Sequence, residues 1–159
     1  MSQKPFQATS FVPSARAFRN FYIYIPGFKN DHIALYDILY HYWNEAEGYA
    51  WPSQAVLQKE SGLSETTVSD RLEDLERYGL ISVQSNPSGL NKTYNLYPPI
   101  EDADFFWSRF PDALARKQKR DAAIDSRAAR PNRAQRRARA ARKTELPAAA
   151  GYEDIIKYL

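Results

Sequence analysis

The chain has 159 residues and a mass of 18.3 kDa, which is enough for one domain with a packed core and an additional arm. It contains no Cys, so disulfides, zinc sites built on thiolates and cysteine nucleophiles are excluded. The formal net charge is +3, but residues 113–143 carry twelve Lys and Arg against two Asp, a balance of +10. The rest of the chain is therefore at −7, and we expect segment 113–143 to hold most of the attraction for a polyanion.

Residues 1–29 are expected to form an N-terminal extension with one short strand. Residues 1–20 lack helical or strand periodicity, so we expect them to lie loosely over the domain or to stay disordered. The apolar run Phe21–Ile25, which Pro26 and Gly27 close, predicts the strand. The first five residues lack the apolar run of a signal peptide, and no stretch has the length needed to cross a bilayer. We therefore expect a protein of the bacterial cytoplasm or nucleoid with no membrane partner.

Three helices are predicted between residues 31 and 77. The spacing of apolar residues predicts a first helix over residues 31–44. Ser53 and Ser64 are predicted N-caps for a second helix to about residue 61 and a third over residues 65–77, and Gly62 is predicted to end the second. The predicted buried residues of the three helices are Leu35, Ile38, Leu39, Tyr42, Val56, Leu57, Val68, Leu72 and Leu75.

A β-hairpin is predicted to follow the third helix. Gly79 ends that helix, residues 80–84 have the alternation of a strand, and residues 93–96 supply its partner across a turn-rich segment that includes Gly89. A pair of prolines, Pro98 and Pro99, marks the end of the unit, so the predicted central domain spans residues 30–100.

The rest of the chain divides by composition into three segments. Residues 101–112 predict an aromatic helical segment that packs back onto the domain. Residues 113–150 are a basic arm or linker rich in Ala and Arg, which is predicted to be disordered or transiently helical, with Asn132 after Pro131 as a helix start. Residues 151–159 form a short amphipathic segment.

The sequence offers little for catalysis. His32 and His41 are nine positions apart with no acidic spacing that makes a metal site, so both are interpreted as ordinary surface or core-edge residues. No glycine-rich phosphate-binding loop is present in the sequence. We therefore predict a protein that is not an enzyme and has no cofactor, no metal site and no small-molecule substrate.

Short motifs along residues 51–96 resemble the winged helix-turn-helix family. They are Trp51-Pro52-Ser53, Ser61-Gly62-Leu63-Ser64, Thr67-Val68, Leu72-Glu73-Asp74-Leu75, Tyr78-Gly79-Leu80-Ile81 and Thr93-Tyr94-Asn95-Leu96. The resemblance is strongest to the domains of phage and plasmid replication initiators and replisome organisers, and of related transcription regulators. It implies an α+β fold with a three-helix core and a β-hairpin wing, followed here by the basic arm. Residues 152–159 are similar to the start of a second domain of some replisome organisers, which implies a fragment or a natural short form.

The resemblance, combined with helical spacing, implies that the third helix and the wing contact double-stranded DNA. Candidate contact residues are Ser64, Thr66, Thr67, Asp70 and Arg71 on the helix, Asn91 and Lys92 in the wing, and Arg133, Arg136 and Arg137 in the arm. Arg71 is expected to reach a guanine edge. The helix has a net charge of −3, however, which leaves open a role in binding a protein.

Two functions are consistent with this pattern. The first is a phage or plasmid replication protein that binds an origin or operator, possible partners being a second copy of the chain and replication proteins. Dimerisation is expected through the first helix or through residues 105–110. The alternatives are a transcriptional repressor of mobile-element genes, or a protein-interaction domain whose arm alone binds nucleic acid without sequence preference.

Overall fold

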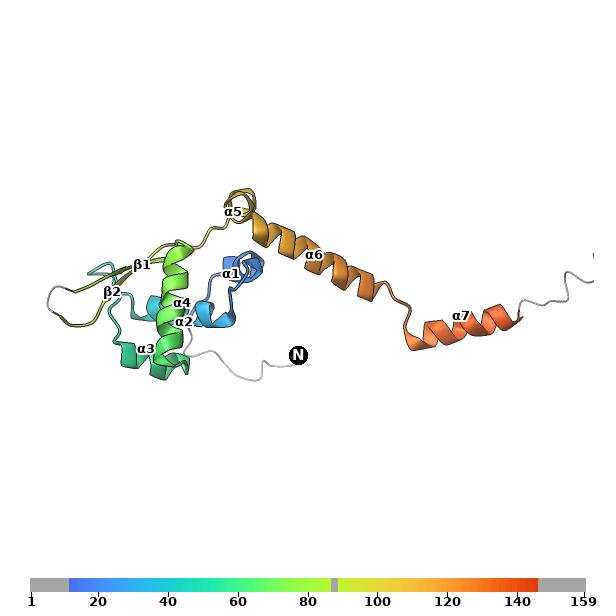
Figure 1. The fold of residues 1–159 in the computed structure, drawn as a ribbon, viewed down its shortest axis with the longest axis horizontal. Helices are drawn as coiled ribbons and strands as arrows, with labels where there is room; N and C mark the ends of the chain where they lie inside the picture. The colour runs from blue at the N-terminus through green and yellow to red at the C-terminus, as the bar shows by residue number, and fades with distance from the viewer. Residues whose placement is uncertain (1–11, 87–88, 146–159) are drawn as a thin grey trace, which may run out of the picture. The chain divides into compact units, whose positions relative to one another are not determined.

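The computed structural model describes residues 12–86 and 89–145 (Figure 1). The chain divides into two compact units, residues 1–117 and 118–159. The predicted segment 151–159 lies outside the described residues. Within the described residues, no helix is long and apolar enough to cross a membrane.

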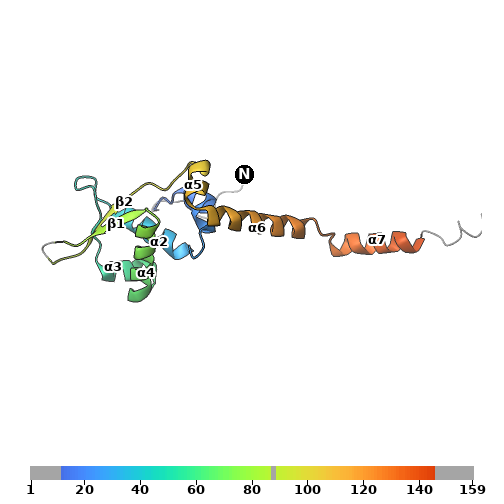
Figure 2. The same ribbon diagram turned by 45° about the horizontal axis from the view of Figure 1, so that its top comes forward.

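Three helices form the centre of the first unit. They are α2 (Asn30–Tyr42), α3 (Gln54–Ser61) and α4 (Glu65–Arg77), as the sequence predicted (Figure 2). Leu35 and Leu39 of α2, Leu57 of α3, and Val68 and Leu75 of α4 are fully buried and belong to one core. Because a helix of this length gains most of its stability from packing its apolar face, this shared core fixes the three helices together.

The predicted caps of these helices are confirmed. The hydroxyl oxygens of Ser53 and Ser64 accept hydrogen bonds from the backbone N–H groups of Val56 and Thr67, at 3.2 and 3.3 Å. Gly62 ends α3 with a φ of +71°, a left-handed conformation that glycine adopts without a side-chain clash. The turn between α3 and α4 is therefore set by the local sequence Ser61–Ser64.

The hairpin that follows α4 pairs β1 (Ile81–Gln84) with β2 (Thr93–Leu96) in antiparallel register (Figure 1). Val83 lies opposite Tyr94, and Tyr94 also bridges to Ala50 in the loop before α3. The two backbone hydrogen bonds between Ala50 and Tyr94 are 2.9 and 2.8 Å long. The segment around Ala50 therefore extends the hairpin on one side and fixes the loop to it.

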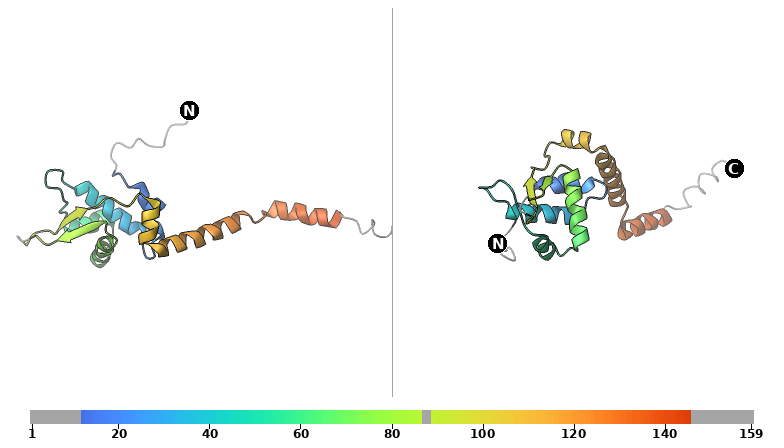
Figure 3. Two further views of the ribbon diagram at one scale, coloured as in Figure 1. Left: turned by 90° about the horizontal axis from the view of Figure 1, so that it is seen from above. Right: turned by 60° about the vertical axis from the view of Figure 1, so that its left-hand side comes forward.

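The predicted strand at Phe21–Ile25 is wrong. Residues Tyr22–Tyr24 form a 3₁₀ turn, η1, directly after the short helix α1 (Arg16–Asn20) (Figure 3). Phe18, Tyr22 and Ile25 are all buried, and their spacing of four and three residues is that of one helical face. The most buried residues of the segment thus share one side of a helical turn, while Phe21, Ile23 and Tyr24 are partly buried against the same core. Residues Arg16–Asn20 form a helix with Ala17 and Phe18 buried, whereas the sequence predicted no helix or strand in residues 1–20.

The aromatic segment is helical, as predicted, and packs on the N-terminal part of the chain. In α5 (Ala103–Arg109), the fully buried Phe106 lies 4.9 Å from Tyr22 and 5.4 Å from Phe21, measured between ring centroids. The backbone N–H of Ile100 also donates to the Tyr22 hydroxyl at 3.0 Å. One aromatic cluster therefore packs α5, which follows the central domain, against residues Phe21 and Tyr22, which precede it.

Two helices follow α5. They are α6 (Pro111–Ala128) and α7 (Arg133–Glu145), and Asn132 begins α7 as predicted. The Asn132 side-chain oxygen accepts from the Gln135 backbone N–H at 2.7 Å, and the Gln135 side-chain oxygen accepts from the Asn132 backbone N–H at 2.9 Å. This reciprocal pair is a capping box, which favours a helix that has no apolar core of its own.

Candidate nucleic-acid interface

Helix α4 presents a polar stripe on the side opposite its core contacts. Thr66, Ser69, Asp70 and Glu73 are exposed, and their spacing of three and four residues places them on one face. Thr66 and Asp70, two of the predicted contact residues, therefore lie where a ligand of the helix would meet them. Ser69 and Glu73 belong to the same face but were not predicted, although their spacing from Thr66 and Asp70 is visible in the sequence.

Ser64 and Thr67, two further predicted contact residues, participate in the cap of α4. The Ser64 hydroxyl donates to the Thr67 hydroxyl oxygen at 2.9 Å and accepts from the Thr67 backbone N–H. A hydroxyl with one proton has none left to donate to a phosphate while it holds this bond. The structure thus assigns Ser64 first to the start of the helix, where it also orients Thr67.

Arg71 is not on the exposed face, contrary to the prediction. Its side chain is only 18% exposed, and its Nε and Nη1 atoms lie 3.7 Å from Asp31 and 3.9 Å from Asp74. Both carboxylates face the same guanidinium at distances longer than a hydrogen bond, and the buried Nε has no hydrogen-bond partner among the described residues, so they offset part of its positive charge. To reach a guanine edge, Arg71 would have to leave two carboxylates and turn away from α2.

His32, predicted at the surface or the core edge, is fully buried. Its Nδ1 accepts from the Lys29 backbone N–H at 2.9 Å, and its Nε2 lies 2.7 Å from an Asp74 carboxylate oxygen. With Nδ1 as an acceptor, the proton is on Nε2, which then donates to Asp74. This bond joins the start of α2 to the last turns of α4. It holds the polar stripe of α4 in a fixed orientation.

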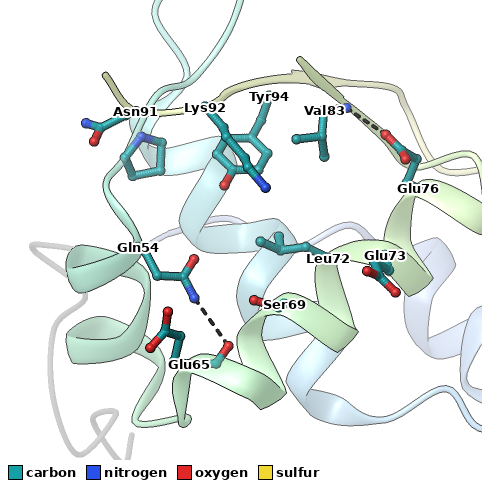
Figure 4. Close-up of a pocket in the computed structure, with 11 residues that line it drawn as sticks. Gln54, Glu65, Ser69, Leu72, Glu73, Glu76, Val83, Asn91, Lys92 and Tyr94 are labelled. Atoms are coloured by element: carbon teal, nitrogen blue, oxygen red, sulfur yellow. Dashed lines mark hydrogen bonds between the residues drawn. The ribbon is translucent and has the colours of Figure 1, made fainter. Parts of the chain in front are cut away.

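A groove of about 510 Å³ lies between α4 and the hairpin (Figure 4). Glu65, Ser69 and Glu73 line it from α4, and Lys92 extends into it from the hairpin side. At one end, Glu76 accepts a hydrogen bond of 2.8 Å from the Val83 backbone N–H and so fixes α4 to β1. The wing and the helix therefore form one surface, in which Leu72, Val83 and Tyr94 add apolar groups to the polar ones.

The two predicted wing residues have different positions. The Asn91 side-chain nitrogen donates to the backbone oxygen of Trp51 at 3.2 Å, which ties the wing to the loop before α3. Lys92 is exposed and is the one basic residue among those that line the groove in the described part of the chain. On the opposite side, Glu65 and Glu73 give the groove an acidic wall. The groove therefore has a positive charge on the wing side and negative charges along α4.

Helix α7 has a basic face. At about 100° per residue, Arg133, Arg136, Arg137 and Lys143 fall within roughly a third of the helix circumference, with Arg139 at its edge. Arg142 lies on the opposite side, and residues 133–144 are all exposed. The three predicted arginines of the arm are thus on one face. We call Arg133, Arg136, Arg137 and Lys143 the basic face.

Comparisons with known proteins agree with this geometry. A family model described as a helix-turn-helix domain matches residues 29–81, about a third of the chain. A solved structure described as the N-terminal domain of a DNA-binding protein is similar over 76% of this chain and 96% of that chain, with 15% identity and a TM-score of 0.50.

Two transcription regulators are more distant in structure. A mutant of MepR from S. aureus bound to an oligodeoxyribonucleotide is 17% identical over 82% of each chain, with a TM-score of 0.39. A MarR family transcription regulator is 17% identical over 92% of this chain and 84% of that chain, with a TM-score of 0.39. No curated protein sequence matches the chain significantly. The three-helix core, the hairpin and the matching family model together show that the chain contains a helix-turn-helix domain with a winged-helix fold.

Proposed function

We propose that the protein binds double-stranded DNA with sequence preference and has no enzymatic activity. The observation that carries the proposal is the exposed stripe of α4 beside the wing. The core residues of α4 hold the helix, while Thr66, Ser69, Asp70 and Glu73 are free on the other side. A helix exposed in this way fits the major groove, which is wide enough to admit one α-helix.

The chemistry of the stripe favours particular base edges. Asp70 and Glu73 are acceptors when ionised, and in the major groove their natural partners are the amino groups of cytosine and adenine. Thr66 and Ser69 can donate or accept. Since Arg71 is paired with two carboxylates, we replace the expected arginine–guanine contact by readout of amino groups.

The basic face of α7 supplies phosphate contacts in this proposal. Each phosphate that a protein neutralises releases condensed counterions, which gives an affinity that depends on salt and not on sequence. Lys92 adds one such contact at the wing. Because the exposed face of α4 is acidic, the larger part of the electrostatic attraction to DNA comes from the arm.

Within DNA binding, we propose a role in replication initiation or replisome organisation in a phage or plasmid, in the cytoplasm or nucleoid. Only the motif resemblance supports this choice over a repressor of mobile-element genes. A homodimer that reads two half-sites is also proposed, through the first helix, which is α2, or through residues 105–110. Leu35 and Leu39 of α2 and Phe106 of α5 are buried in their own core, which leaves Tyr40 and Phe105 as exposed aromatic residues of these helices.

A second candidate function is protein binding through α4, with the arm alone on nucleic acid. The acidic character of this side of α4 favours it, since Glu65 and Glu73, which line the groove, and the exposed Asp70 would repel phosphates that come near them. The two candidates differ in what a single carboxylate does. In a DNA interface its removal changes sequence preference, whereas in a protein-binding surface it leaves sequence preference unaltered.

The test compares Glu73→Gln with Glu101→Gln, another exposed glutamate outside the groove. Fluorescence anisotropy measures binding of each full-length variant to random duplex DNA and to DNA from the neighbourhood of its own gene, over a series of salt concentrations. We expect Glu73→Gln to raise affinity for random DNA by about threefold. The threefold change corresponds to the repulsion of about 0.6 kcal/mol between a carboxylate and a phosphate charge separated by about 7 Å of water. It should also reduce the preference for local DNA by about tenfold.

Glu101→Gln should change neither affinity. If Glu73→Gln also changes neither, while the wild-type protein binds both DNAs equally and only at low salt, α4 is not in the interface. The protein would then be a helix-turn-helix domain that binds a protein partner and uses only the arm on DNA.

A further inference from the structure

The flank of the wing carries a second depression, on the side of the hairpin next to the loop before α3. It has a volume of about 440 Å³, and we call it the wing hollow. Its lining includes Glu47, Tyr49 and Trp51 from the loop, and Leu90, Asn91 and Thr93 from the hairpin. Its size is within the range of small-ligand sites, which is about 300 to 1,000 Å³.

Two large apolar side chains of the hollow are exposed. Trp51 is 41% exposed and Leu90 is 75% exposed, although the domain has a complete core without them. Adjacent exposed apolar residues on a domain surface mark a contact more often than single ones do. The pair thus requires an explanation other than packing within the domain.

The rings and the loop are held in place before any ligand arrives. Trp51 packs edge-to-face on Tyr49, with ring centroids 5.5 Å apart and an interplanar angle of 63°. The Asn91 side chain holds the Trp51 backbone oxygen, and the Ala50–Tyr94 bridge pins the neighbouring residue. A preorganised aromatic ring loses little entropy when a ligand stacks on it.

The charge of the hollow decides which part of a nucleic acid it fits. Among the described residues that line it there is no Lys or Arg, and Glu47 adds a carboxylate at the rim. A phosphate would be repelled there, whereas a neutral planar ring can stack on an aromatic side chain. The Glu47 carboxylate is an acceptor for the amino group of a base.

We propose that the wing hollow binds an unpaired nucleobase of the DNA that α4 and the wing engage. The base stacks on Trp51 and contacts Leu90, while Lys92, next to Asn91, lies on the other side of the wing for a backbone phosphate. This inference rests on the proposed function. To DNA binding by α4 and the wing, the inference adds a preference for DNA in which one base has left the stack.

The experiment uses the full-length protein and two duplexes of one sequence, one perfectly paired and one with a single unpaired 2-aminopurine, a fluorescent adenine analogue. Anisotropy gives the two affinities, and quenching of 2-aminopurine fluorescence reports stacking. Stacking of a base on an aromatic side chain changes affinity substantially, and we expect the wild-type protein to prefer the duplex with the unpaired base by about tenfold.

Leu90→Ser and Trp51→Ala should each remove most of this preference and the quenching, with affinity for the paired duplex within about twofold of the wild type. Leu90→Ser matters most, because a residue so exposed can be replaced without a core defect. Ile124→Ala is the matched control, since Ile124 is 49% exposed on α6 and does not line the hollow. It should retain the preference.

Each outcome separates this proposal from the proposed function. Tight binding to the paired duplex, with no preference for the unpaired base and no quenching, refutes only the proposal that the wing hollow binds a base. The hollow would then be a site for an apolar segment of a protein partner. Binding only to the duplex with the unpaired base, lost in both hollow variants, supports the hollow and refutes recognition of paired DNA. Binding to neither duplex refutes both.

Discussion

A single arginine on the basic face of α7 should control the salt dependence of DNA binding. Arg137 lies on that face, and Arg142 on the opposite side of the same helix carries the same charge and is also exposed. The perturbation is Arg137→Gln, and Arg142→Gln is its matched control. Glutamine keeps much of the side-chain length and has a helix propensity close to that of arginine, so the two variants differ mainly in where charge is lost.

The expected size follows from counterion release. Loss of one phosphate contact lowers the slope of log K against log salt by about 0.9. Extrapolated from 1 M to 0.1 M salt, this corresponds to about an eightfold loss of affinity at 0.1 M. Arg137→Gln should show this loss equally for random and local DNA, whereas Arg142→Gln should lower the slope by less than half as much.

Anisotropy titrations at five or six salt concentrations, with each variant and both DNAs, measure the slopes. Equal reductions for Arg137→Gln and Arg142→Gln would refute the reasoning, because they would mean that α7 does not present one face to the backbone. A change in sequence preference in Arg137→Gln would also contradict it, since phosphate contacts carry no sequence information directly.

Three further predictions concern the framework of the domain. Ser64→Ala should lower the free energy of unfolding, measured by urea denaturation, by about 1 kcal/mol through loss of the N-cap. The control is Ser69→Ala, which replaces an exposed serine within the helix and should not lower it. Tyr36→Phe should cost about 1 kcal/mol in the same assay, because it removes the 2.8 Å bond to the Tyr97 backbone oxygen. It should also remove one phenol that titrates late in ultraviolet absorbance, since burial raises the pKa of Tyr36 to about 12. Burial raises the pKa of Asp37 above 3.8, so ionisation of this carboxyl destabilises the folded state as the pH rises. The stability of Asp37→Asn relative to the wild type should therefore increase between pH 3 and pH 7. A difference in the free energy of unfolding that does not change with pH would contradict this account.

The helices and the wing were predictable because their ends are encoded locally. Ser53 and Ser64 are good N-caps, and Gly62 and Gly79 allow the left-handed conformations that end α3 and follow α4. At Gly79 there is also a close approach, since a Cβ built there would lie 2.8 Å from Arg109 Nη2. These signals need no knowledge of distant parts of the chain.

The N-terminal aromatic run could not be assigned in the same way. A run of aromatic and β-branched residues fits a strand, but it equally fits a short helix when one side faces the core. Two ring contacts of Tyr22 favour the helical turn. Phe28 lies just after the run, but Phe106 is more than 80 residues away in the sequence, so its contact could not be predicted locally. The partner of His32 is likewise invisible locally, because Asp74 lies 42 residues further along the chain.

For the candidate site, helical geometry alone separates Arg71 from the exposed stripe of α4. At about 100° per residue, Arg71 is roughly 60° from Val68, so it borders the buried stripe rather than the exposed one. Glu73 lies close to the direction of Thr66 on the exposed side. What the geometry could not show is that Asp31 of α2 approaches Arg71 and, with Asp74, offsets part of its charge.

The position of Arg71 changes how the two parts of the chain share the work of binding DNA. With the charge of that arginine partly offset, the exposed stripe of α4 contains acceptors and hydroxyl groups, which discriminate among bases but contribute no attraction to the backbone. The arm has the reverse character, because its basic face is exposed and has no apolar residue to place in a core. Sequence preference and salt dependence should therefore be separable by mutation. Glu73→Gln should alter the first with little change in slope, and Arg137→Gln should alter the slope with no change in preference.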